Sequence, residues 1–130
     1  MAGERILLVE DNPHNRRLAQ FLLQARGYVV DEATTGEEAL ELARTHQPAL
    51  ILMDLQLPGM DGYAVTRRLK ADAATASIMV VALTAYAMPG DRDKALAAGC
   101  EGYIPKPIDT KEFSAAVQRY LGSTRQPGEA

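Results

Sequence analysis

The sequence predicts a doubly wound α/β domain, in which helices cover both faces of a parallel sheet. Short apolar runs alternate with longer amphipathic runs along the chain, which is the pattern of consecutive strand–helix–strand units. The run at residues 49–55 is almost continuously apolar, as expected of a strand buried on both faces. The chain has 130 residues, enough for one domain with its own hydrophobic core.

The first half of the chain predicts three strands joined by two helices. Leu18, Phe21 and Leu22 fall at helical spacing in the first helix, and Gly27 is placed to end it. In the second helix, alanine and leucine recur on one face. The predicted strands cover residues 5–10, 28–33 and 49–55, and the predicted helices cover 13–27 and 36–46.

The second half continues the alternation. The predicted strands cover residues 78–84 and 102–107, and the predicted helices cover 62–72, 89–99 and 109–122. Asp109 is the expected N-cap of the last helix. Helical crossovers predict parallel pairing, with the strands in the order 2-1-3-4-5. We expect residues 5–122 to form the domain and residues 123–130 to form a flexible tail.

Composition excludes several classes of protein. The formal net charge of -3 gives no electrostatic reason to expect binding to nucleic acid or to an anionic membrane. Cys100 is the only cysteine, so no disulfide forms within the chain and a reducing compartment fits. No signal peptide or membrane-spanning stretch is recognisable. The sequence therefore predicts a cytoplasmic protein.

Polar residues follow four of the predicted strands at the point where each strand ends. Glu10 and Asp11 follow the first strand, Asp54 the third, Thr84 the fourth and Lys106 the fifth. In an open parallel sheet, ligands bind outside the carboxyl ends of the strands, where the winding reverses. Because the first and third strands are neighbours in the predicted order, three carboxylates should meet at this edge.

Such a cluster of acids predicts a metal site. Two carboxylates about 4 Å apart repel each other by about 4 kcal/mol at an effective dielectric constant near 20. A divalent cation relieves this repulsion. Because the candidate ligands are oxygen atoms, with no histidine or cysteine among them, Mg²⁺ is favoured, and Mn²⁺ is a suitable substitute.

The remaining residues at this edge suit phosphate chemistry. Asp54 is the candidate nucleophile, since a carboxylate can accept a phosphoryl group as an aspartyl phosphate. Lys106 supplies a mobile positive charge, and Thr84 supplies a hydroxyl donor, for the phosphoryl oxygens. The metal ion and Lys106 would neutralise the charge that develops during transfer.

These residues lie in motifs that resemble those of the response-regulator receiver domain of two-component signalling. The motifs are VEDN, LILMDLQLPGMDG, VALTAYA and YIPKP, and the resemblance extends from about Ile6 to Leu121. The segments EDNPHN and GYIPKPID are most similar to single-domain regulators of the DivK type and to receivers of hybrid histidine kinases. The resemblance implies a flavodoxin-like, CheY-like fold with five helices around five parallel strands.

The resemblance also implies roles for individual residues. Asp54 would be the phosphoacceptor. Asp11 would bind Mg²⁺ directly and Glu10 directly or through water, and the backbone carbonyl of Gln56 would complete the protein ligands.

Further implied roles concern the phosphoryl group and the output. Thr84 and Lys106 would contact the phosphoryl group, Tyr103 would be the aromatic residue of the switch, and the peptide bond before Pro107 would be cis. The phosphodonor would be a histidine kinase or a histidine phosphotransfer protein. A downstream protein would bind the surface formed by the fourth helix, the fifth strand and the fifth helix.

Alternative interpretations use parts of the same pattern. A phosphatase of the haloacid-dehalogenase type also has an aspartate nucleophile after a strand, but its second acid would fall at Gln56, which cannot exchange a proton. A nucleotide-binding domain needs glycines to hold phosphates, and EDNPHN has none. Thr84 also fits an ordinary strand-end residue, and Glu10 and Asp11 fit acids at a helix N-terminus. The chain also fits a receiver excised from a hybrid histidine kinase.

Overall fold

The architecture matches the prediction from the sequence. The computed structural model describes residues 3–57, 61–84, 89–106 and 108–129. Parallel strands form one five-stranded sheet in the order β2-β1-β3-β4-β5. The strands are β1 (Arg5–Val9), β2 (Val29–Ala33), β3 (Leu50–Asp54), β4 (Met79–Thr84) and β5 (Gly102–Pro105). The helices are α1 (Pro13–Ala25), α2 (Gly36–His46), α3 (Gly62–Ala71), α4 (Pro89–Ala98) and α5 (Glu112–Glu129).

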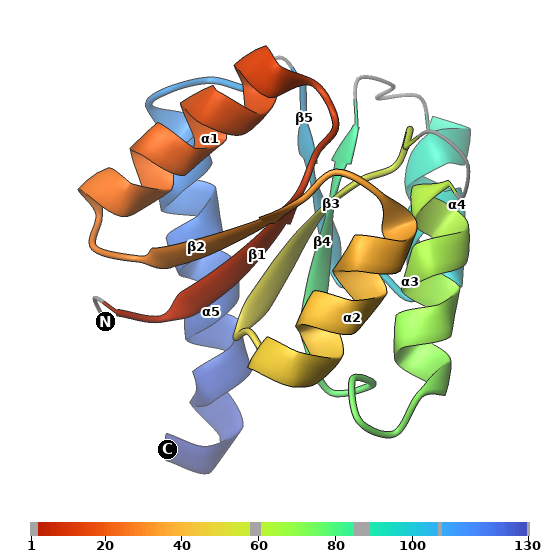
Figure 1. Cartoon of the computed structure of the whole chain (residues 1–130). Coiled ribbons are helices and arrows are strands. Elements are labelled where there is room, and N and C mark those ends of the chain that lie inside the picture. The colour runs from red at the N-terminus through yellow and green to blue at the C-terminus, as the bar shows by residue number, and fades with distance from the viewer. Residues whose placement is uncertain (1–2, 58–60, 85–88, 107, 130) are drawn as a thin grey trace.

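The helices form a layer on each side of the sheet. Helices α1 and α5 cover one face, and α2, α3 and α4 cover the other (Figure 1). Successive residues of a strand point to opposite faces, so each face has its own core. Phe113 and Leu23 pack with Leu8 and Leu52 on the first face, and Val65 and Leu69 belong to the core cluster of the second. All five residues of β3 are buried, which explains the continuous apolar run in its sequence.

Polar caps fix where the helices begin. Asn12, Thr35 and Asp61 are the N-caps of α1, α2 and α3, and each side chain accepts a backbone N–H from the first turn of its helix. Gly27 follows the end of α1 with a φ of 88°, a left-handed conformation in which glycine is unstrained. The predicted stop at this glycine is therefore confirmed.

The last helix differs from the prediction at both ends. It begins at Glu112, and the Asp109 carboxylate accepts the backbone N–H groups of Lys111 and Glu112 at 2.8 and 3.1 Å. At its other end the helix continues to Glu129, beyond the predicted end at Gly122. Local sequence alone would favour an earlier end, because Pro127 has no backbone N–H to donate to the preceding turn. The structure nevertheless continues the helix past this proline. The flexibility of residues 123–130 and the domain limits 5–122 stay predictions.

One glycine sets how closely α3 approaches the centre of the sheet. Gly62 is the first residue of α3, and a Cβ atom there would lie 2.4 Å from the backbone oxygen of Asp54 and 2.6 Å from Cα of Leu55. Real Cβ atoms do not come this close to backbone. Only glycine therefore allows α3 to begin directly against the end of β3.

Candidate functional site

The candidate site lies at the carboxyl edge of the sheet, and backbone pairing brings its residues there. Met53 is in register with Val9 of β1, and Asp54 is in register with Leu83 of β4. Glu10, one residue beyond β1, donates its N–H to the backbone oxygen of Ala33 at 3.0 Å. The strand ends that carry the predicted residues therefore meet at one edge.

Three carboxylates gather at this edge, and we call Glu10, Asp11 and Asp54 the acid cluster. One oxygen atom from each lies within 4.8 Å of the others. Glu10 and Asp54 are only 1% and 2% exposed, whereas Asp11 is exposed and leaves the cluster open to solvent. An all-oxygen set of this kind fits Mg²⁺ or Mn²⁺.

Lys106 provides the positive charge of the site. Its ammonium nitrogen lies 2.9 Å from Oε1 of Glu10 and 3.3 Å from Oδ1 of Asp54. The side chain is 12% exposed, and the backbone N–H donates to the Thr84 carbonyl at 2.7 Å. Lys106 is thus anchored to the end of β4 and lies between the two buried acids.

Burial raises the pKa of Glu10 above its ordinary value. The adjacent ammonium group of Lys106 opposes this shift, and the charge of Asp54 adds to it. Oε2 of Glu10 accepts the backbone N–H of Asn12 at 3.2 Å. Among the described residues, Oε1 has the Lys106 ammonium as an ion-pair partner but no well-directed hydrogen bond. A buried oxygen in that state fits a ligand for a cation.

The carboxylate of Asp54 is oriented by its own turn. Oδ1 accepts the backbone N–H of Gln56 at 3.0 Å, and the same oxygen faces Lys106. The side chain is therefore held toward the cluster even though it ends a fully buried strand. The Gln56 residue is exposed, and the role of its carbonyl as a metal ligand stays a prediction.

The other predicted residues lie along β4 and β5. Thr84 is 3% exposed at the end of β4, opposite Pro105 in the sheet register. Tyr103 is half-buried on β5, and the guanidinium carbon of Arg92 lies 5.4 Å from the centre of its ring, a cation–π distance. Pro107 lies outside the described residues, so the cis bond stays a prediction.

Arg16 contacts the site and has no role in the sequence analysis. Its Nη1 group donates to the backbone oxygens of Glu10 and Asp11 at 3.0 and 3.3 Å. The sequence does carry a signal, because Arg16 lies near the start of a helix that follows two acids. From that position an arginine can reach back to the backbone carbonyls of the acids. That signal is weak because most helical arginines are solvated.

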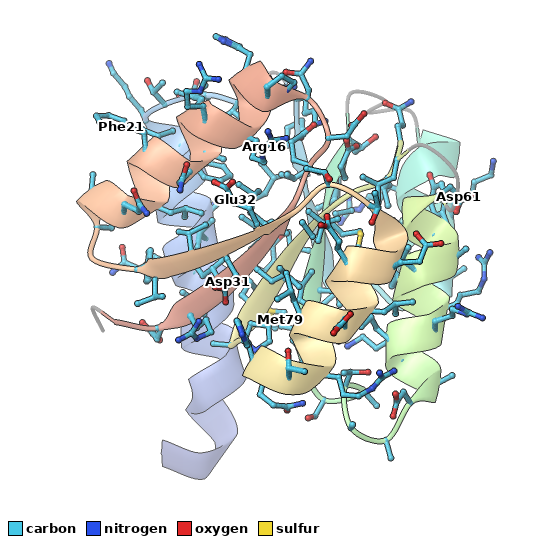
Figure 2. All side chains as sticks on the ribbon, viewed as in Figure 1. Arg16, Phe21, Asp31, Glu32, Asp61 and Met79 are labelled. Carbon is cyan, nitrogen blue, oxygen red and sulfur yellow. The ribbon has the colours of Figure 1, made fainter. Side chains whose placement is uncertain are left out.

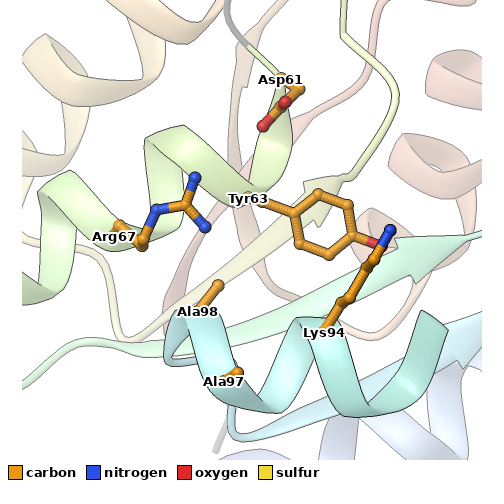
Figure 3. A pocket seen from close by; sticks show the side chains of 6 residues that line it. All are labelled: Asp61, Tyr63, Arg67, Lys94, Ala97 and Ala98. Carbon is orange, nitrogen blue, oxygen red and sulfur yellow. The ribbon is translucent and has the colours of Figure 1, made fainter. Parts of the chain in front are cut away.

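A hollow of about 420 Å³ lies between α3 and α4 (Figure 3). Its lining shares no residue with the acid cluster and consists of Asp61, Tyr63, Arg67, Lys94, Ala97 and Ala98. This hollow therefore does not coincide with the candidate site. Charge and burial identify the candidate site instead.

Comparison with known proteins agrees with the geometry. The chain matches the response regulator receiver domain family over residues 6–118. The chain belongs to this family. The receiver is 46% identical over 117 residues to the polar-differentiation response regulator DivK of Brucella ovis, and the match covers 90% of this chain and 95% of DivK. The predicted resemblance is confirmed.

Solved structures give the same result. The receiver domain of a sensor histidine kinase from Pseudomonas aeruginosa, with a magnesium ion coordinated in its active-site cleft, has a TM-score of 0.85 and 40% identity; the match covers 93% of this receiver and 99% of that chain. A CheY-like receiver domain protein from Methanospirillum hungatei has a TM-score of 0.87 at 25% identity, covering 96% and 98%.

The family match, the DivK relatives and the kinase receiver together define the class of function. This receiver is a phosphorylation-based signalling switch that is similar to DivK. Within the part of the chain that the structure describes, every helix is too short or too polar to cross a lipid bilayer.

Proposed function

We propose that this receiver accepts a phosphoryl group on Asp54 from a histidine kinase or a histidine phosphotransfer protein. The position of Lys106 between two buried acids carries the proposal, since a cation held at 2.9 and 3.3 Å from Glu10 and Asp54 is placed to meet an incoming phosphoryl group. The chemistry is a displacement at phosphorus. An Asp54 oxygen forms the new bond while the bond from phosphorus to the donor imidazole nitrogen breaks, and the electron pair leaves with that nitrogen.

The acid cluster and the carbonyl of Gln56 would hold Mg²⁺, with Mn²⁺ as a substitute. When bound, the ion would neutralise negative charge on the phosphoryl oxygens. Lys106 would exchange part of its contact with Asp54 for a phosphoryl oxygen, and the Thr84 hydroxyl would donate to another. The magnesium in the active-site cleft of the Pseudomonas receiver supports this assignment of the cofactor.

The same site is poorly suited to rapid turnover. The position two residues after Asp54 is Gln56, which cannot serve as a general acid or base. An aspartyl phosphate would therefore persist, and a persistent covalent state is useful as a signal. We propose that the receiver catalyses its own phosphorylation and a slow dephosphorylation and acts on no other substrate.

The output would be a protein–protein contact at the surface of α4, β5 and α5. Tyr103 lies on that surface with Arg92 against its ring, and a hollow of about 190 Å³ beside it is partly lined by Phe113 and Tyr120. Thr84 would couple this surface to Asp54. The overall charge of -3 favours neither a nucleic-acid nor a membrane partner, and the cytoplasmic location stays a prediction.

A small phosphodonor tests the proposal without the cognate kinase. Acetyl phosphate with Mg²⁺ should raise the intact mass by one phosphoryl group, and chelation of the metal should prevent the gain. Asp54→Asn should remain unlabelled, whereas Asp93→Asn, which removes an exposed acid of α4, should label like the wild type. Equal labelling of Asp54→Asn would contradict the assignment of the phosphoacceptor.

A further inference from the structure

We propose that Arg16 is a positioning residue for the metal site: it holds the backbone of residues 10–12, which we call the acid loop. The inference rests on the proposed function, because it concerns the ion that the acid cluster would bind. One nitrogen of the guanidinium donates to two successive carbonyls of the loop, those of Glu10 at 3.0 Å and Asp11 at 3.3 Å. These are the residues whose side chains supply two of the three carboxylates.

Arg16 is itself fixed from the neighbouring strand. Its Nε lies 3.5 Å from Oε1 of Glu32 on β2, and the two side chains are 23% and 31% exposed. Figure 2 shows the pair at the level of the acid loop, beneath the first turns of α1. Glu32 is opposite Leu8 in the register of β1 and β2. The ion pair thus ties the guanidinium to the sheet and offsets its positive charge.

The contacts of Arg16 restrain the acid loop. The loop joins the end of β1 to the start of α1, and its own hydrogen bonds, from Asn12 N–H to Glu10 and from Asn15 N–H to Asn12, are short-range. Arg16 adds a link from the helix to both carbonyls. A planar guanidinium can serve two carbonyls and a carboxylate at once, whereas a lysine ammonium lacks that fork geometry.

Arg16 could affect the metal site through its charge or through its hold on the acid loop, and the two effects predict opposite changes in Mg²⁺ affinity when Arg16 is removed. If Arg16 acted mainly as a positive charge near the site, its removal would strengthen Mg²⁺ binding, because like charges repel. If it acts by holding the acid loop, removal weakens binding, because the carboxylates lose their preset arrangement. Glu32 offsets the charge of Arg16, so we expect the positioning effect to dominate.

The test measures Mg²⁺ binding by calorimetry and amide hydrogen exchange of the acid loop in metal-free protein. Arg16→Gln should raise the Kd for Mg²⁺ about 10-fold, the lower end of the loss seen when a group that supports metal ligands is removed. Exchange of the loop amides should accelerate. Arg16→Lys should weaken binding as well, despite keeping the charge. Arg17→Gln, the same charge change at an exposed position, should leave both quantities within about twofold.

Two results would overturn the inference. One is an Arg16→Gln receiver that binds Mg²⁺ as tightly as the wild type or more tightly. The other is weakened binding with unchanged loop exchange in both Arg16 variants. If Arg16→Gln does not fold, the result for Arg16→Lys decides. Failure of the proposed function looks different, since the wild type itself would then bind no Mg²⁺ or remain unlabelled by acetyl phosphate.

Discussion

Some charged residues of the sheet contact two partners of opposite charge. Substituting such a residue therefore leaves two partners without their counter-charge. Lys106 faces both Glu10 and Asp54, so its removal would leave two buried acids facing each other. At the opposite end of the strands, Asp31 faces both Arg5 and His46: Arg5 donates to it at 2.9 and 3.2 Å, and Nδ1 of His46 lies 2.9 Å away. The group around Lys106 belongs to the candidate site, whereas the group around Asp31 contributes to the stability of the fold.

Thr84→Ala should separate phosphorylation from signalling. Asp54 should still be labelled by acetyl phosphate, because the nucleophile, the acid cluster and Lys106 remain. The ring resonances of Tyr103 in NMR spectra should no longer shift on phosphorylation, because no hydroxyl remains to follow the phosphoryl group. A switch from mostly inactive to mostly active needs about 5.5 kcal/mol of differential interaction, and a charge-assisted hydrogen bond is a substantial part of that. Thr84→Ser should restore the response, and a wild-type response in Thr84→Ala would disprove the coupling.

Asp31 gives a pH dependence whose sign follows from its pKa. Burial would raise this pKa, but the hydrogen bonds from His46 and Arg5 outweigh it and lower the pKa from the ordinary 3.8. A lowered pKa means that the ionised carboxylate stabilises the fold above pH 3.8 and that this contribution disappears as the pH falls through the lower, folded value.

Asp31→Asn should therefore cost about 1 kcal/mol of unfolding free energy near neutral pH. Urea unfolding at about pH 7 and about pH 3 should show the difference from wild type shrinking at the acid end. Asp93→Asn, which removes an exposed carboxylate, should show no such dependence. A cost that is constant with pH would contradict the assigned ion pairs.

At the scale of elements, Asp54, the proposed phosphoacceptor, is fixed by the strands and the helix that pack against it. β3 is the central strand, paired with β1 and β4, and α3 starts against its last carbonyl at Gly62. After β3, the N–H group of Gln56 donates to the Asp54 carboxylate at 3.0 Å, and the N–H group of Gly62 donates to the Leu55 carbonyl at 3.2 Å. Asp54 is thus placed by strand pairing and by the close approach of α3.

Gly62→Ala should disturb the site by displacing the backbone at the end of β3. The added methyl would meet the backbone of Asp54 and Leu55 at 2.4 and 2.6 Å, and backbone cannot yield as a side chain can. We expect a loss of about 2 kcal/mol in unfolding free energy, typical of overpacking, with slower phosphorylation because Asp54 shifts. Gly90→Ala is the matched control in α4: nothing lies within 4 Å of the added Cβ, so stability should be equal or slightly higher. Equal behaviour of the two variants would refute the packing argument.

At the scale of the whole molecule, the proposed ion binding would be linked to folding. The acid cluster exists only when β1 and β3 pair, so an ion that binds it stabilises the folded state alone. Glu10 and Asp54 are almost fully buried, and Lys106 is their shared counter-charge. Repulsion between the carboxylates of the cluster therefore lowers the free energy of unfolding when no cation is bound.

Mg²⁺ should raise the melting temperature by about 10 °C at 100 times its Kd, since that concentration adds about 2.7 kcal/mol to the unfolding free energy. Asp11→Asn should reduce this rise by more than half, because one ligand loses its charge. Without metal, the variant should melt at the same temperature or higher, because one repulsive charge is gone. Calorimetric scans with Mg²⁺ and with chelator measure both effects, and a melting temperature insensitive to millimolar Mg²⁺ would show that the site is misplaced.

The sequence predicts the fold well because its signal is periodic. The continuous apolar run of β3 and the repeated strand–helix alternation leave few alternatives to a parallel sheet. The edge location of Glu10, Asp11, Asp54 and Lys106 follows from the same rule, since the carboxyl ends of parallel strands meet. Helix caps are also local, and Gly27 was identifiable for that reason.

Side-chain contacts between distant segments were not predictable in the same way. The reach of Arg16 to the acid loop depends on its rotamer and on Glu32, which is brought near by sheet register. The requirement for glycine at position 62 depends on an interatomic approach that no pattern encodes. His46 is exposed, and its contact with Asp31 depends on the way α2 returns to the sheet.

The outer strands bear on whether copies of the molecule polymerise. β2 and β5 are the open edges of the sheet, and an unpaired edge invites a strand from another molecule. β2 carries Asp31 and Glu32, whose counter-charges Arg5 and Arg16 come from the same chain. β5 has only four residues and ends in Pro105, which lacks an N–H donor. Charge at one edge, and shortness with proline at the other, oppose fibre-like extension of the sheet, so copies of the receiver can crowd together without joining strand to strand.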